Sequence, residues 1–364
     1  MQVKTILKNF ISYYTGLVNP FPLGYVTLGI TYACQSRCVM CNVWQVYQKN
    51  PEKINLELAP KIWVDALTKS RIIKELKQIA ITGGEPFLKE GLNEIMLALF
   101  GLSNLKKIAL FSNGFMPDRI FCVTESIMKL IAGDKTLEIN IALDGYGKLH
   151  EEIRRVPRAF ELVEETIEKL KILQYSYPNL RLGIVSVIQP RNIDTLNRLE
   201  EFVCGKKLPI SYLVILDSYV LDNRNNAYNR YSFSALQKDK LIKLIKIYQM
   251  LGMERWIKTG KRPLRCFAGF TSMYIDAYGN MYPCVTMGNN HDFLMGNIKE
   301  KGIDEIWSSS QAFKVRKKVK HCQYTDCWGG CEIEQTLVQH RLLARITEMI
   351  SLGGLNYYRL RRLI

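Results

Sequence analysis

The feature of this sequence that most constrains its fold is the alternation of short β-branched runs with longer amphipathic stretches. The β-branched runs predict strands at residues 25–31, 78–82, 107–111, 138–143, 181–188 and 210–216. The amphipathic stretches predict helices, for example at residues 92–99, 126–131, 160–173 and 193–202. Successive strand–helix units favour parallel strands with right-handed crossovers. Six units are too few for a closed eight-stranded barrel, so the sequence predicts an α/β fold built on a partial (β/α)6 barrel.

Composition and charge narrow the class of protein. The chain has 364 residues, which suggests about two domains at roughly 100–200 residues each. Hydrophobic residues make up 48% of it and charged residues 23%, values that exclude a mainly disordered chain. The formal net charge of +16 favours contact with nucleic acid, an anionic membrane surface or an acidic small molecule. Because no nucleic-acid-binding module is recognisable, no nucleic acid is expected as a partner.

The sequence gives no sign of export. Its first residues contain no apolar run followed by a small-residue cleavage site, and no stretch of about 18 apolar residues predicts a membrane-spanning helix. We therefore expect a cytoplasmic protein. Its cysteines are then expected to be reduced thiols that are available as metal ligands.

The first group of cysteines directly follows the first predicted strand. Cys34, Cys38 and Cys41 have the spacing C-x3-C-x2-C. Thiolates are soft ligands, and three on one short loop can each bind one iron of a [4Fe–4S] cluster. The fourth iron then lacks a protein ligand, which leaves the open position that a catalytic metal needs. Zinc or unliganded thiols are the alternatives, although structural zinc sites usually combine two distant cysteine pairs.

This spacing after a first strand resembles the radical S-adenosylmethionine (SAM) superfamily. The resemblance extends from residue 25 to about residue 334 and implies the partial barrel. It also implies that SAM chelates the open iron and that an electron cleaves SAM to a 5′-deoxyadenosyl radical, which abstracts hydrogen from a substrate. A donor of the flavodoxin or ferredoxin type is the expected source of the electron. The cofactors carry out the chemistry, while the protein positions the reactants and excludes water.

Further motifs at predicted strand ends carry the same resemblance. The second strand ends in Gly83, Gly84, Glu85 and Pro86, which match the GGEP motif that binds the SAM amino group in this family. After the third and fourth strands, the resemblance assigns SAM-binding positions to Ser112, Asn113, Asp144 and Arg154.

Arg154 offers a guanidinium that suits the SAM carboxylate, with a solvated helix face as the alternative, and His150 is interpreted as structural. Three positions depart from the family pattern. Met40 replaces an aromatic residue, Ala142 replaces a serine and Arg158 replaces a glycine. None of these changes removes a cluster ligand.

A second group of cysteines lies near the C-terminal end. Residues 274–284 are predicted to form a hairpin with a glycine turn that ends at a cysteine. The pattern resembles a shortened SPASM/Twitch extension of radical SAM enzymes. The implied auxiliary ligands are Cys266, Cys284, Cys322, Cys327 and Cys331. Five cysteines cannot supply eight ligands, so one auxiliary [4Fe–4S] cluster is expected, and a zinc site built from four of them is the alternative.

Two isolated cysteines are interpreted differently. Cys122 and Cys204 lie in helix-like segments and are predicted to be core thiols, with a radical-quenching hydrogen donor as the alternative. Beyond the sixth strand, Asp217 and Tyr219 are candidates for a substrate-side base and hydrogen donor.

Five regions are expected along the chain. An N-terminal amphipathic segment (1–24) precedes the barrel (25–220), a linker with a helix (221–260), the auxiliary domain (261–335) and a basic amphipathic tail (336–364). The tail is of the kind that lies on anionic lipid, with a helix packed on the barrel as the alternative. We therefore expect a radical SAM enzyme that oxidises, couples or epimerises an unidentified substrate. The basic tail adds the hypothesis of a lipid or lipid-linked substrate and of peripheral contact with the inner membrane face. A peptide-modifying maturase and a non-enzymatic zinc or iron–sulfur protein are the alternatives.

Overall fold

The fold is known from a computed structural model that describes residues 22–215, 218–223, 233–247, 253–259 and 266–322. Within these residues one sheet has the strand order β6-β5-β4-β3-β2-β1-β7-β8-β9. Its first six strands in the chain all pair in parallel. They are β1 (Tyr25–Gly29), β2 (Gln78–Thr82), β3 (Lys107–Ser112), β4 (Thr136–Ala142), β5 (Leu180–Ile188) and β6 (Ile210–Val214). The predicted partial barrel is confirmed.

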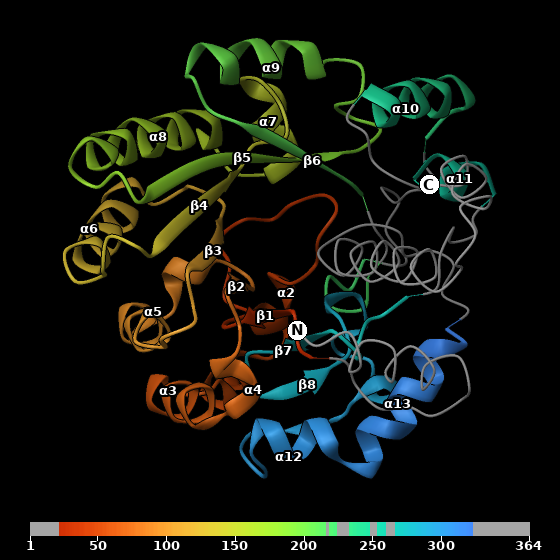
Figure 1. The fold of residues 1–364 in the computed structure, drawn as a ribbon. Helices are drawn as coiled ribbons and strands as arrows, with labels where there is room; N and C mark the ends of the chain where they lie inside the picture. Colours follow the sequence, from red (N-terminus) through yellow and green to blue (C-terminus); the bar gives the residue numbers. More distant parts are fainter. Residues whose placement is uncertain (1–21, 216–217, 224–232, 248–252, 260–265, 323–364) are drawn as a thin grey trace, which may run out of the picture.

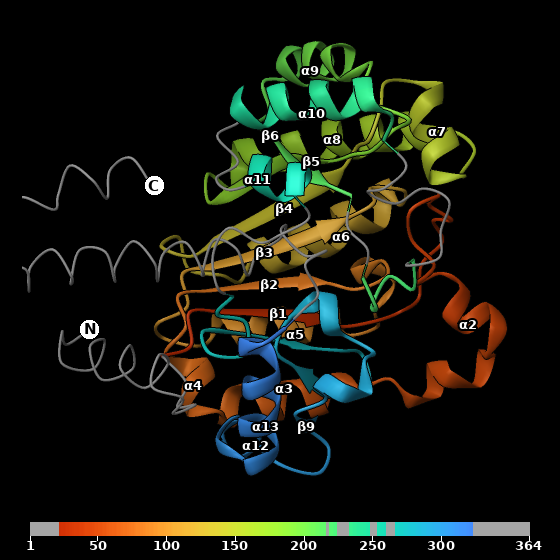
Figure 2. The same ribbon diagram turned by 90° about the vertical axis from the view of Figure 1, so that its right-hand side faces the viewer.

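Helices cover the outer face of the curved sheet, as Figure 1 shows. They are α3 (Pro60–Lys69), α5 (Leu92–Phe100), α6 (Pro117–Met128), α8 (Ala159–Ser176) and α9 (Leu196–Gly205), whereas α4 (Arg71–Lys74) and α7 (Lys148–Arg154) lie toward opposite ends of the strands, as Figure 2 shows. In α8 the buried residues Val163, Ile167 and Leu170 recur at helical spacing, and this apolar stripe packs into the core. Because the first six strands are parallel, their carboxyl ends lie at the same edge of the sheet. The loop after β1 leads from this edge to α2 (Gln45–Lys49), as Figure 2 shows.

Helix α6 differs from its prediction at residues 126–131. It begins at Pro117, because proline is well suited to the first turn of a helix, and it ends at Met128. Its buried side chains include Ile120, Thr124 and Ile127, which places Cys122 on the opposite face.

The prediction that Cys122 and Cys204 are core thiols is wrong, because both are exposed. In α9 the buried positions are Leu196, Leu199 and Val203, so Cys204 lies beside the buried stripe rather than in it. Both thiols therefore lie at the protein surface, away from the core of the barrel.

The C-terminal part of the described chain extends the same sheet. The predicted hairpin is confirmed: β7 (Ser272–Ile275) and β8 (Asn280–Tyr282) are antiparallel, with Gly279 at a φ of +88° in the turn. Strand β7 also pairs in parallel with β1, which the sequence did not predict. The remaining α-helices and strands of the described residues are α10 (Ala235–Ile247), α11 (Met253–Thr259), β9 (Gly296–Asn297), α12 (Ile303–Ser308) and α13 (Ser310–Lys320).

A side chain from α12 joins this part of the chain to the barrel. The carboxylate of Asp304 accepts hydrogen bonds from the Ser70 hydroxyl (2.6 Å) and from the backbone N–H of Arg71 (2.8 Å). It therefore caps the N-terminus of α4 from a residue more than 230 positions away in the sequence. Burial raises the pKa of Asp304, but the hydrogen bonds from Ser70 and Arg71 outweigh burial and lower it overall.

Candidate active site

The first three cysteines lie on the loop that follows β1, and backbone contacts hold the start of this loop. Thr31 accepts a hydrogen bond from the N–H of Gly84 (2.7 Å), and Ala33 accepts one from Glu85 (2.7 Å). A Cβ atom on Gly83 would come within 2.3 Å of the Thr31 carbonyl oxygen, where Gly83 also has a φ of +142°. The glycines therefore allow the loop after β2 to approach the cysteine loop closely.

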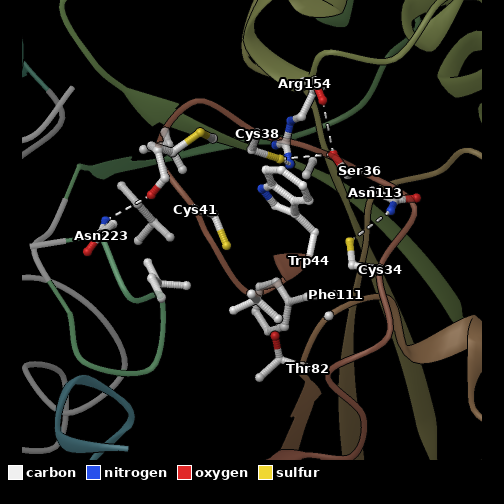
Figure 3. Close-up of a pocket in the computed structure, with 18 of the residues that line it drawn as sticks. Cys34, Ser36, Cys38, Cys41, Trp44, Thr82, Phe111, Asn113, Arg154 and Asn223 are labelled. Carbon is white, nitrogen blue, oxygen red and sulfur yellow. Dashed lines mark hydrogen bonds between the residues drawn. The ribbon is translucent and has the colours of Figure 1, made fainter. Parts of the chain in front are cut away.

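The three thiols line one cavity of about 320 Å³ (Figure 3). One side of the cavity is formed by the ends of β2 and β3 and the loops after them, at Thr82, Gly83, Gly84, Ser112 and Asn113. The opposite side is largely apolar and comes from β6 and the segment after it, at Leu213, Val214, Ile215 and Leu221. The structure thus brings the predicted cysteines together with Gly83, Gly84, Ser112, Asn113 and Arg154.

Glu85 lies behind the cavity rather than in its wall. Its carboxylate is fully buried and accepts hydrogen bonds from the Ser112 hydroxyl (2.9 Å) and from the backbone N–H of Asn113 (2.7 Å). Burial raises the pKa of Glu85 to about 7, although these hydrogen bonds act in the opposite direction. Glu85 therefore fixes the end of β3, and Asn113 in turn directs its amide nitrogen to the Cys34 sulfur at 3.9 Å.

Arg154 and Asp144 form a buried ion pair beside the second cysteine. Their side chains are 2.7 Å apart, with exposed fractions of 9% and 0%. The guanidinium also donates to the Cys38 sulfur at 3.5 Å, so the alternative of a solvated helix face is wrong for Arg154. Burial raises the pKa of Asp144, and Arg154 counteracts this increase.

Hydrogen bonds with neighbouring segments hold Asp144 in place, and it does not line the cavity. Its carboxylate accepts a hydrogen bond from the backbone N–H of Val187, and its carbonyl accepts one from Asn192 (both 2.8 Å). Its own N–H donates to Nδ1 of the fully buried His150 at 3.1 Å. These contacts fit the structural interpretation of His150 and make Asp144 a residue that positions Arg154.

Sequence reasoning missed a buried carboxylate at the base of the cysteine loop. Glu57 accepts hydrogen bonds from the Thr31 hydroxyl (2.6 Å) and the Tyr32 N–H (2.9 Å). It also pairs with Lys89 at 2.8 Å, and these two side chains are only 7% and 9% exposed. Tyr47 donates a further hydrogen bond to it. No spacing motif links these residues, so only the fold could identify Glu57 as a support of the loop.

The segment after β6 lies against the cysteine loop. Asn223 is fully buried and donates a hydrogen bond to the Met40 carbonyl at 2.8 Å. The N–H of Asn42 donates to Leu221 at 2.8 Å, and the N–H of Tyr219 donates to Thr286 at 3.1 Å. Tyr219 is not among the residues that line the cavity. The other candidate, Asp217, lies outside the described residues.

The second group of cysteines is carried by segments that contact one another. The N–H of Gly269, three residues after Cys266, donates to the Pro283 carbonyl next to Cys284 at 3.0 Å. From α13, which leads to Cys322, the buried Arg316 donates to the Gly269 carbonyl at 2.6 Å. Cys327 and Cys331 lie outside the described residues.

The sulfur-lined cavity suits an iron–sulfur cluster. Burial raises the pKa of the Cys34 thiol and that of Cys41, the latter to about 12, and Cys38 adds to both increases. Three thiolates in such a place need a compensating positive charge, which iron supplies. Among the described residues no three His, Cys, Asp or Glu side chains converge as they would on a single metal ion. The thiols of a cubane cluster instead surround several irons.

Comparison with known families identifies this chain. The family model described as "Radical SAM superfamily" matches residues 28–203, and SPASM, described as "Iron-sulfur cluster-binding domain", matches residues 266–332. The chain is a radical SAM enzyme with a SPASM domain. A radical SAM domain implies a [4Fe–4S] cluster and SAM, and the SPASM domain implies auxiliary iron–sulfur binding. The alternative of a non-enzymatic zinc or iron–sulfur protein is therefore wrong.

Individual relatives of this radical SAM enzyme are distant. The sporulation killing factor maturation protein SkfB of Bacillus subtilis is 22% identical over 329 residues, which cover 85% of this chain and 70% of SkfB. The AdoMet-dependent heme synthase of Methanosarcina barkeri is 22% identical over 336 residues, covering 83% of this chain and 89% of the synthase.

Solved structures agree on the fold. Streptococcus suis SuiB bound to S-adenosylmethionine aligns with a TM-score of 0.60 at 17% identity, over 89% of this chain and 77% of SuiB. The structure of anSMEcpe with bound AdoMet and the Cp18Cys peptide aligns with a TM-score of 0.56 at 18% identity, over 85% and 89% of the two chains. In the described part of this radical SAM enzyme, no helix has both the length and the apolar character needed to cross a membrane.

Proposed function

We propose that this radical SAM enzyme holds its catalytic cluster through Cys34, Cys38 and Cys41 and binds SAM in the adjoining cavity. The single observation that carries the proposal is the convergence of these three thiols with Gly83 and Gly84 on one cavity. When bound and reduced, the cluster would supply the electron for cleavage of SAM to methionine and a 5′-deoxyadenosyl radical, which would abstract hydrogen from the substrate.

The protein residues position the reactants and exclude water. The Arg154 guanidinium, held by Asp144, contributes positive charge beside Cys38, and we assign its remaining donor capacity to the SAM carboxylate. The backbone of the loop after β2 offers carbonyl groups for the SAM amino group. Leu213, Ile215 and Leu221 form an apolar wall, which keeps water away from a reactive radical.

We further propose that the substrate is a peptide. Two relatives support this class by name: the SkfB protein already described, and the antilisterial bacteriocin subtilosin biosynthesis protein AlbA of B. subtilis. The structural neighbour anSMEcpe was solved with a peptide bound. The lipid-linked substrate and the peripheral membrane contact remain predictions, because they rest on residues 336–364, which lie outside the described residues.

We assign the auxiliary cluster to Cys266 and Cys284, completed by ligands from Cys322, Cys327 and Cys331. The buried position of Cys284 and its proximity to the Cys266 segment support this assignment. The cluster would carry away an electron from the substrate or anchor the substrate. A flavodoxin or ferredoxin is the proposed electron donor.

Transfer of deuterium tests the reaction and the substrate class together. The anaerobically reconstituted enzyme is incubated with SAM, dithionite and either the peptide fraction or the lipid fraction of cells grown in deuterium oxide. We expect 5′-deoxyadenosine with one added deuterium from the peptide fraction alone, and none with the Cys34→Ala variant. Deuterium from the lipid fraction alone would contradict the peptide proposal, and absence of 5′-deoxyadenosine in every arm would contradict the reaction.

A further inference from the structure

Trp44 presents an unused hydrogen-bond donor at the cysteine cavity. Its indole lines the cavity together with Cys34, Cys38 and Cys41. The Nε1 atom is shielded from solvent, and no acceptor among the described residues bonds to it. In Figure 3 the nitrogen side of the ring faces the space between Cys38 and Cys41. A buried N–H without an acceptor is unfavourable, so this orientation suggests that an acceptor belongs in the cavity.

Contacts on the protein side fix the indole in this position. Trp44 directly precedes α2, and the Arg37 guanidinium lies over its ring at 5.8 Å from the ring centre. A cation over an aromatic face is attracted to it, so Arg37 holds the ring and leaves its N–H edge toward the cavity. A second cavity-lining side chain, Arg154, also has a buried nitrogen, Nε, without an acceptor. Two buried nitrogens at the cavity, on Trp44 and Arg154, thus lack acceptors among the described residues, as expected around an occupant that can accept hydrogen bonds.

A missing acceptor is not sufficient by itself, and the chain contains an internal comparison. Trp63 on α3 is fully buried, and its Nε1 likewise has no acceptor among the described residues. Trp63 belongs to the apolar core and is not among the residues that line the cysteine cavity. What distinguishes Trp44 is its position among the three thiols.

We propose that the Trp44 indole N–H donates a hydrogen bond to a sulfur of the cluster bound at Cys34, Cys38 and Cys41. This inference rests on the proposed function, and it makes Trp44 a positioning residue that tunes the cluster. A hydrogen bond to a cluster sulfur stabilises the reduced, more negative state. Trp44 thus raises the reduction potential of the catalytic cluster.

A redox titration tests this role. Trp44→Phe retains an aromatic ring for Arg37 but removes the N–H, and Trp63→Phe is the matched control. The electron paramagnetic resonance signal that is lost in the Cys34→Ala variant identifies the catalytic cluster. We expect Trp44→Phe to shift the midpoint potential of this signal to more negative values without SAM, and Trp63→Phe to leave it unchanged. Equal potentials for Trp44→Phe and the wild type, or weaker SAM binding as the only effect, would overturn the inference.

A label on the wild-type enzyme avoids dependence on the folding of a variant. With ¹⁵N-indole tryptophan incorporated, electron–nuclear double resonance of the reduced catalytic cluster should show a nitrogen coupling and an exchangeable proton. Absence of both from a cluster that has assembled would contradict the role of Trp44. If no cluster assembles on the wild type, the proposed function fails instead.

Discussion

The two cysteine sites are built in different ways. At the first site the three cysteines occupy one short loop, and buried charges support it: Glu57 with Lys89 at its base and Arg154 with Asp144 beside it. At the second site the cysteines come from separate segments. Hydrogen bonds to backbone carbonyls hold these segments: the N–H of Gly269 donates to Pro283, and the buried guanidinium of Arg316 donates to Gly269 and Trp307. The first site therefore depends on electrostatic positioning of a local motif, and the second depends on tertiary packing.

Loss of a cysteine from the first site gives the largest expected effect. In the Cys34→Ala variant, formation of 5′-deoxyadenosine from SAM should fall to background, because the catalytic cluster loses a ligand. About four irons per chain should be lost, while the auxiliary iron remains. Iron analysis and chromatography of the products provide the measurement. Loss of iron from both sites would break the comparison, since it would show that they assemble as one unit.

Removal of a buried charge tests the electrostatic support of the first site. Arg154→Met leaves Asp144 buried and unpaired, which should lower the free energy of unfolding by about 3–5 kcal/mol. Denaturant titration of the reconstituted enzyme measures this change. The control is Arg158→Met, which removes the exposed pair with Glu161 and should have little effect. If the double change Asp144→Asn with Arg154→Met is no more stable than Arg154→Met alone, the pairing argument is contradicted.

The cap formed by Asp304 tests the packing between the C-terminal part and the barrel. Asp304→Ala removes the acceptor for Ser70 and Arg71 and should lower the free energy of unfolding by about 0.5–2 kcal/mol. Asp304→Asn retains one acceptor oxygen and should lose less. Because folding lowers the pKa of Asp304, its stabilising effect is present above the unfolded value of 3.8 and disappears as the pH falls below it. A stability difference between Asp304→Ala and wild type that is unchanged at low pH would contradict this account.

The smallest effect is expected at the two exposed cysteines. Cys122→Ser and Cys204→Ser should change the free energy of unfolding by no more than about 0.5 kcal/mol and should leave SAM cleavage intact. Iodoacetamide should alkylate both thiols readily in the folded, reconstituted enzyme, because both are exposed. Protection of either thiol, or loss of turnover with cleavage preserved, would instead support the radical-quenching alternative.

Sequence patterns predicted the barrel more fully than the site. The strands were predicted within about two residues because parallel strands buried on both faces are short, mostly apolar runs rich in β-branched residues, as in β1 and β5. The cysteine loop and the GGEP segment were predicted because their residues are local in sequence. The helical phase of Cys122 was missed, because its helix begins at Pro117 rather than near Ser126.

Contacts between distant segments could not be predicted from the sequence. Glu57 meets Tyr32 and Lys89 only when β1 and the loop after β2 come together. The hairpin of β7 and β8 was predicted from its own residues, but no local signal shows that β7 pairs with β1. The spacing of residues in the sequence identifies cluster ligands on one loop. The residues that support this loop come together only in the complete fold.

The most direct test of the central claim concerns the open iron. A Cys266→Ala, Cys284→Ala variant reconstituted with ⁵⁷Fe carries iron at the catalytic site alone, and Mössbauer spectra are recorded with and without SAM. If three cysteines hold the cluster and leave one corner for SAM, a single iron of the [4Fe–4S] cluster should change its isomer shift when SAM is added. Spectra in which no iron responds to SAM, or a site that retains no iron, would contradict the account.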